Sequence, residues 1–276
     1  MELKTFGGMG VRVSEIGMGT YYDPGWMLWA SLGWRRGSAR RVEALREGLA
    51  GGINLIDTAE IYNSEGLVAE AIKGYGRQDL FIATKVSPTH LGYDSVLKAL
   101  QRSLNRLRTP YVDLYQVHFP RPGMSMKDTM RAMEDLLDQG KIRAIGVSNF
   151  SLDRMVEANA ALRKARLAST QMEYSLSHRS VEEDILPYCA KENIAVLAYR
   201  PLGHGKLATE QAKLRKFCEK YSKTPAQVAL RWLASQPGVF PIPRASNPLH
   251  VKDDLGASGW QMEEADLREL GELFPA

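Results

Sequence analysis

The sequence contains little that would cross-link the chain or direct it to a membrane. Its 2 cysteines, Cys189 and Cys218, are far apart in the 276 residues, which argues against a disulfide framework or a thiolate metal site and fits a reducing compartment. No apolar run approaches the ~20 residues that span a bilayer. Residues 1–5 lack the charged and apolar regions of a signal peptide. We therefore expect a cytoplasmic protein with no membrane partner.

The sequence also lacks a long tract of one charge. Lysine and arginine number 36 against 32 acidic residues, which gives a net charge of +4, and the two signs are interspersed. This pattern argues against nucleic acid as a partner but suits an anionic cofactor. We interpret the arginine pairs at 35–36 and 40–41 as the solvated start of a helix. Apolar residues at 44% and charged residues at 25% are typical of a globular protein.

Short β-branched segments alternate with longer amphipathic ones, and no composition break separates domains. After a hairpin at 3–6 and 11–16, strands are expected at 16–19, 53–56, 80–85, 112–117, 142–147, 167–171, 194–198 and 239–242. Helices are expected at 38–50, 94–106, 127–138, 152–161 and 225–232, with Ser125, Ser151 and Thr224 as N-caps. Eight strand–helix units predict a parallel sheet closed into a (β/α)8 TIM barrel of the α/β class, one domain over residues 1–276.

Several of these strands end on chemically reactive side chains. Asp57 follows the second strand with Tyr62 five residues later, Lys85 ends the third, and His118 ends the fourth. Each has a structural explanation alone, such as a helix cap, a surface aromatic or a buried histidine with satisfied hydrogen bonds. Since the carboxyl ends of barrel strands meet at one face, their shared placement favours a catalytic site.

The four side chains together suit protonation of a carbonyl oxygen. Tyr62 is the candidate acid, and a neighbouring Lys85 ammonium is expected to lower the phenol pKa from about 10. Asp57 would keep Lys85 charged, while His118 would orient the carbonyl. No side chain supplies a hydride, so this chemistry requires a nicotinamide cofactor. The glycine fingerprint of a Rossmann domain is missing, because residues 17–22 lack its third glycine.

At this point the chain resembles the aldo-keto reductase family over nearly its whole length. The matching motifs are Gly17-Met18-Gly19-Thr20, Asp57-Thr58-Ala59 with Tyr62, Thr84-Lys85, Gln116-Val117-His118, Gly146-Val147-Ser148-Asn149-Phe150, Gln171-Met172-Glu173-Tyr174, Tyr199 with Pro201-Leu202-Gly203, and Ile242-Pro243-Arg244-Ala245-Ser246-Asn247. Each motif is weak alone, but their order and spacing are specific.

The resemblance implies a barrel whose N-terminal hairpin closes the bottom, and metal-independent, NADPH-linked reduction of aldehydes and ketones. It implies Tyr62 as general acid, tuned by Lys85 and Asp57, with His118 on the carbonyl. Ser148, Asn149 and Gln171 would bind the nicotinamide amide, Tyr199 would stack on its ring, and residues 201–205 would pass over the pyrophosphate. The implied cofactor-binding residues are Gly19, Thr20, Ser148, Asn149, Gln171, Tyr199, Arg200, Pro201, Leu202, Gly203, Gly205, Pro243, Arg244, Ser246, Asn247, His250, Asp253 and Asp254.

The adenosine end departs from the family pattern. Arg244 favours NADPH because its guanidinium fork suits a 2′-phosphate. However, His250 stands where relatives usually have arginine or glutamine, and Asp254 where they have asparagine, so use of NADH stays open. Arg200 replaces a usually small residue, and either a pyrophosphate contact or a surface salt bridge fits it.

The substrate is predicted only in outline. The loop at 21–29 is rich in aromatics, and Tyr21 and Trp26 are the candidate pocket walls, unless their rings only cover the barrel mouth. The short segment after His118 and the short tail, residues 273–276, predict an open site that accepts many small carbonyl compounds. We expect a monomer or small homo-oligomer.

The sequence leaves two alternatives to a reductase. An NADPH-binding regulatory subunit with slow turnover is the main alternative, and bound cofactor without turnover would favour it. A metal-dependent barrel hydrolase is disfavoured, because the 5 histidines are scattered and only His118 ends an expected strand.

Overall fold

Eight parallel strands form the centre of the computed structural model, which describes residues 1–33 and 36–274. They follow one another in chain order around the sheet. The strands are β3 (Met18–Gly19), β4 (Leu55–Asp57), β5 (Phe81–Val86), β6 (Leu114–Val117), β7 (Ile145–Ser148), β8 (Leu167–Glu173), β9 (Ala195–Tyr199) and β10 (Val239–Pro241). Backbone hydrogen bonds from Gly17 N to Pro241 O (2.9 Å) and from Gly19 N to Pro243 O (2.8 Å) join the first strand to the last. The sheet is thus the predicted barrel.

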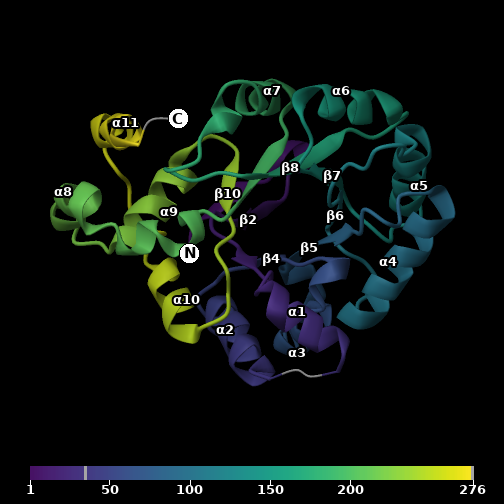
Figure 1. Ribbon diagram of the computed structural model, residues 1–276, viewed down its shortest axis with the longest axis horizontal. Coiled ribbons are helices and arrows are strands. Elements are labelled where there is room, and N and C mark those ends of the chain that lie inside the picture. The colour runs from purple at the N-terminus through teal and green to yellow at the C-terminus, as the bar shows by residue number, and fades with distance from the viewer. Residues whose placement is uncertain (34–35, 275–276) are drawn as a thin grey trace.

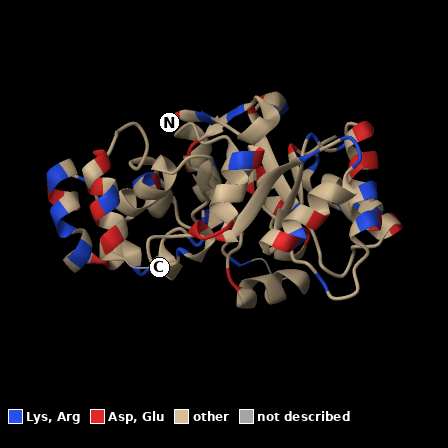
Figure 2. Cartoon of the chain, turned by 90° about the horizontal axis from the view of Figure 1, so that it is seen from above, with Lys and Arg blue, Asp and Glu red and all other residues tan. Residues whose placement is uncertain are grey.

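Helices surround the strands (Figure 1). They are α1 (Pro24–Ser31), α2 (Ser38–Ala50), α3 (Glu65–Ala71), α4 (Tyr93–Leu107), α5 (Met126–Asp138), α6 (Leu152–Ala161), α7 (Ile185–Glu192), α8 (Gln211–Tyr221), α9 (Pro225–Ser235), α10 (Pro248–Leu255) and α11 (Glu264–Leu273). On α4, for example, Val96, Leu100 and Leu104 lie on one face at helical spacing and are buried. Figure 2 shows charges of both signs mixed on the outer helices, while the strands are largely uncharged.

The predicted helix caps are confirmed. The hydroxyl groups of Ser125 and Ser151 accept hydrogen bonds from Asp128 N and Arg154 N, respectively. Thr224 and Gln227 form a reciprocal capping box at the start of α9. These local signals therefore set the start of three helices.

The N-terminal hairpin lies across the end of the barrel where the strands begin. It consists of β1 (Leu3–Thr5) and β2 (Arg12–Ser14), paired antiparallel. The turn approaches the strands so closely that a Cβ on Gly7 would lie 2.8 Å from Asn193 O and 3.0 Å from Ala168 O. Phe6 fills the bottom of the barrel and is fully buried. The hairpin therefore closes the bottom of the barrel.

The segment at 21–29, expected to be a loop, is largely helical. Helix α1 covers Pro24–Ser31, and the Asp23 carboxylate accepts a hydrogen bond from Trp26 N (2.6 Å). An Asp-Pro pair at the N-cap and first helical position is a helix-start signal that the aromatic content obscured. Of the arginine pairs, Arg35 lies outside the described residues, and Arg40 and Arg41 lie in the first turn of α2. Among the described helices, none is long and apolar enough to cross a bilayer.

Candidate active site

Lys85, at the end of β5, is the centre of a buried cluster at the carboxyl ends of the strands. Its Nζ lies 2.7 Å from Asp57 Oδ2, 2.8 Å from Thr58 O and 3.4 Å from the Tyr62 hydroxyl oxygen. Burial lowers the pKa of Lys85 and raises that of Asp57, while the attraction between the pair opposes both shifts. Each of the three ammonium hydrogens has an acceptor, which favours the charged form of Lys85.

His118, at the end of β6, completes the cluster. Its Nε2 lies 3.2 Å from the Tyr62 hydroxyl oxygen. Burial, helped by the Lys85 charge, lowers the pKa of His118 to about 2, so the imidazole is neutral. Four side chains that stand apart in the sequence, Asp57, Tyr62, Lys85 and His118, thus lie in one connected group.

The expectation that Tyr62 has a lowered pKa is wrong for this structure. Burial raises its pKa well above the usual value, and the Asp57 charge adds to the effect. The phenol therefore keeps its proton at neutral pH until negative charge develops beside it.

Aromatic rings stand around the cluster. Tyr21 is 39% exposed and its ring meets that of Tyr62 edge-on at 5.2 Å. Phe119 is 42% exposed and stacks on His118 at 4.7 Å. Phe119 was not among the residues predicted to line the pocket, although its position directly after His118 was the available signal.

Trp26, in contrast, is built into the helix packing. It is only 7% exposed, its ring lies 5.0 Å from that of Tyr22, and its indole N–H donates to Arg36 O. These contacts favour the alternative that this ring covers the barrel mouth, and we do not retain Trp26 as a pocket wall.

Polar side chains from the next three strands connect to the cluster. Gln171 Nε2 donates to Asp57 Oδ1 (2.8 Å), and Asn149 Nδ2 donates to His118 O (3.1 Å). Ser148 Oγ donates to Gln171 O (3.0 Å), and the Tyr199 hydroxyl donates to Asn149 Oδ1 (2.9 Å). The residues predicted to bind the nicotinamide end are therefore gathered beside the cluster.

The segment after β9 turns sharply at four residues with positive φ: Arg200 (51°), Gly203 (53°), His204 (58°) and Gly205 (88°). Pro201 is buried and Leu202 is half-buried within this turn. Arg200 Nη1 lies 2.9 Å from Glu173 Oε2 near the surface. Of the two roles expected for Arg200, the structure thus shows the surface salt bridge.

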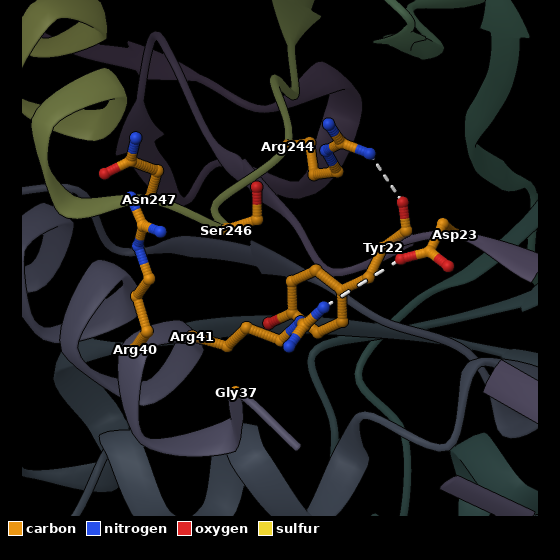
Figure 3. A pocket seen from close by; sticks show the side chains of 8 residues that line it. All are labelled: Tyr22, Asp23, Gly37, Arg40, Arg41, Arg244, Ser246 and Asn247. Carbon is orange, nitrogen blue, oxygen red and sulfur yellow. Dashed lines mark hydrogen bonds and ion pairs between the residues drawn. The ribbon is translucent and has the colours of Figure 1, made fainter. Parts of the chain in front are cut away.

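A basic cavity lies between the start of α2 and the segment after β10 (Figure 3). Arg244, Ser246 and Asn247 line one side of it. The backbone of Gly19 bridges to Arg244, and the side chain of buried Thr20 donates to Asp57 O. The residues after β10 that were predicted to bind phosphate are therefore joined to the end of the barrel that carries the Lys85 cluster.

Three other predicted cofactor residues do not line this cavity. His250 is exposed on α10. The Asp253 carboxylate accepts hydrogen bonds from Thr224 Oγ1 (3.1 Å) and Gln227 Nε2 (2.9 Å) at the start of α9. Asp254 is buried, and burial raises its pKa to about 8.

Known proteins similar to this chain share its architecture. The model of the Aldo/keto reductase family matches residues 15–274. Methylglyoxal reductase YeaE of Escherichia coli K12 is 34% identical, covering 96% of this chain and 93% of its own length. The thermostable aldo-keto reductase Tm1743, solved with the inhibitor epalrestat, superposes with a TM-score of 0.89 at 33% identity over 99% of this chain and 100% of its own. An aldo/keto reductase of Klebsiella pneumoniae, solved with NADP and acetate, gives 0.87 at 31% identity, covering 100% and 96%.

Proposed function

Because the chain belongs to the aldo-keto reductase family, we propose that it reduces aldehydes and ketones to alcohols with NADPH and that Tyr62 is the proton donor. The main support for this proposal is the contact of the Tyr62 hydroxyl with both Lys85 Nζ (3.4 Å) and His118 Nε2 (3.2 Å). A phenol between a cation and a neutral imidazole is suited to donate a proton to a carbonyl oxygen.

In the proposed reaction, bound NADPH supplies the hydride. The carbonyl oxygen of the substrate is held by the Tyr62 hydroxyl and His118 Nε2. As negative charge develops on that oxygen, the Tyr62 proton moves to it, and the Lys85 ammonium stabilises the phenolate that remains. Asp57 holds Lys85 in place through its 2.7 Å contact. General acid help of this kind contributes ~10²–10⁴-fold to the rate.

The residues present fit this cofactor at both ends. At the nicotinamide end, Gln171 Oε1 has no partner in the part of the chain that the structure describes, and it can accept from a carboxamide N–H. Ser148 and Asn149 lie beside it, and Tyr199 offers a half-buried ring. At the other end, Arg244, Ser246 and Asn247 line a cavity rich in donors. The NADP complex of the K. pneumoniae relative supports the same assignment.

We propose small carbonyl compounds as substrates. The exposed rings of Tyr21 and Phe119 offer apolar contact beside the proton donor. The E. coli relative is named for methylglyoxal, a small dicarbonyl. We therefore expect turnover of methylglyoxal, phenylglyoxal and 4-nitrobenzaldehyde, with the aromatic compounds giving the lower KM.

The decisive test is Tyr62→Phe. It removes the acidic proton while keeping the ring, so we expect kcat with NADPH to fall by at least about 10²-fold while the Kd for NADPH, measured by fluorescence, is unchanged. Tyr75→Phe, on an exposed tyrosine, is the matched control. A near-normal kcat for Tyr62→Phe would disprove the acid assignment. Tight NADPH binding by the wild type without turnover of any carbonyl compound would favour the regulatory alternative.

A further inference from the structure

We propose that Arg40, in the first turn of α2, binds the 2′-phosphate of NADPH from the side of the cavity opposite Arg244. The inference rests on the proposed use of NADPH and deepens it. It assigns the specificity for NADPH over NADH to two arginines, Arg40 near the start of the chain and Arg244 near its end.

The cavity has the size and position of a ligand site. Its volume is about 340 Å³, at the lower end of the ~300–1,000 Å³ usual for small-molecule pockets. Gly19 pairs with Asp57 on one side and bridges to Arg244 on the other. The cavity therefore lies at the same end of the barrel as Tyr62, where one dinucleotide can reach both.

Among the residues that the structure describes, three arginines and one aspartate are the charged residues that line the cavity, which gives this lining two net positive charges. The guanidinium of Arg41 packs against two aromatic rings, because it lies 4.7 Å from the centres of both the Tyr22 and Trp26 rings. It also lies 3.9 Å from Asp23 Oδ2 and so offsets that carboxylate. The other two cations, Arg40 and Arg244, have no neutralising partner among the described lining residues.

The donors of these two arginines are largely unused. Arg244 gives one N–H to Tyr22 O (2.6 Å), which fixes its direction and leaves the rest of its fork open. Among residues 1–33 and 36–274, Arg40 has no hydrogen-bond or ion-pair partner. In Figure 3 its side chain extends toward Asn247, across the cavity from Arg244. A phosphate monoester, with three acceptor oxygens, is the ligand that this arrangement of guanidinium groups fits.

Neutral donors complete the site. Ser246 lines the cavity between Arg244 and Asn247, and Asn247 Oδ1 accepts from Leu249 N at the start of α10. The amide nitrogen of Asn247 therefore remains available as a donor. His250, in the first turn of α10, is exposed and is not part of the lining. The positive charge at this site thus comes from α2 and from the segment after β10, and not from α10.

The test compares ligands with and without the 2′-phosphate by isothermal titration calorimetry. Wild type is expected to bind 2′-AMP more tightly than 5′-AMP, and NADPH more tightly than NADH. Arg40→Gln should weaken 2′-AMP and NADPH by about tenfold or more, as for loss of a charge-assisted hydrogen bond. It should leave 5′-AMP and NADH within about twofold, because they lack the group that Arg40 binds.

Arg46→Gln is the matched control, because Arg46 is also exposed on α2 but pairs with Glu70 outside the cavity. Equal weakening of NADPH and NADH by Arg40→Gln, or no weakening of either, overturns the inference. The same holds if the wild type does not prefer 2′-AMP. Each of these results leaves the proposed reduction intact where Tyr62→Phe still abolishes turnover, so the two proposals fail separately.

Discussion

At the scale of single residues, burial decides the protonation states that sequence position only suggests. The sequence predicts that Lys85 lowers the pKa of Tyr62, yet the phenol is so deeply enclosed that its pKa is raised instead. The same enclosure keeps His118 neutral. Desolvation acts on each group through the atoms packed around it, which the order of residues along the chain does not give.

Asp254 provides a residue-scale prediction about stability. Its carboxyl group has no hydrogen-bond or ion-pair partner among the described residues, and burial, with the Asp253 charge, raises its pKa from 3.8 to about 8. Between these pH values the folded state holds more protons than the unfolded state, so the free energy of unfolding falls as the pH rises through this range. We expect Asp254→Asn to be more stable than wild type at pH 9, by up to about 5 kcal/mol, with the difference vanishing toward pH 4.

Urea denaturation from pH 5 to pH 9 measures this difference. Asp153→Asn, at an exposed position on α6, should follow the wild-type profile. A constant offset between Asp254→Asn and wild type at every pH would contradict the account.

At the scale of elements, apolar runs predicted the strands and their order, because both faces of a barrel strand are buried. The observed strand ends differ from the predicted ones by a few residues, because hydrogen bonding to the neighbouring strands decides where each strand ends. Helix α1 was missed, because its aromatic residues masked an ordinary Asp-Pro start. The site residues follow the strands, so they were predicted, whereas Phe119 in a loop was not.

A buried ion pair joins helix α9 to the segment that follows the hairpin. Arg231 on α9 donates to both oxygens of Glu15 (3.0 and 2.8 Å), just after the hairpin. We expect Arg231→Met to lower the free energy of unfolding by about 3–5 kcal/mol, because it leaves Glu15 buried and unpaired. Adding Glu15→Gln should recover most of that loss. Urea denaturation of Arg231→Met and of the double variant measures both free energies of unfolding. If the double variant is destabilised as much as Arg231→Met, the explanation is contradicted.

At the scale of the whole molecule, the two ends of the barrel differ in the residues they carry. The upper end, where the strands stop, carries the cluster around Lys85 and the basic cavity. The lower end is closed by the hairpin, whose Phe6 ring packs against Phe81 (4.7 Å) and Phe240 (5.0 Å). Because the proposed catalytic residues lie at one end and the closing hairpin lies at the other, we expect substitutions in the hairpin to change stability without changing the proposed chemistry.

Phe6→Ala tests this separation. Loss of a fully buried ring leaves a cavity, so we expect the free energy of unfolding to fall by about 3–5 kcal/mol. The kcat at 25 °C should stay within about twofold of wild type, because the bottom of the barrel holds none of the proposed catalytic residues. Denaturation and steady-state kinetics on the same preparation measure both effects. A fall in kcat comparable to that of Tyr62→Phe would show that the two ends are coupled.

The sequence by itself determined the fold class, the strand order and the four side chains of the cluster. Alternating buried strands and amphipathic helices specify a barrel, and a barrel brings strand ends together. Only the tertiary structure decided the rest. Closure between β3 and β10 brings Arg40 and Arg41 to the cavity of Arg244, and packing buries Trp26 while leaving Phe119 exposed beside His118. Such contacts depend on the distances in space between segments that are remote in the chain. The local sequence pattern predicts helices and strands but not these distances.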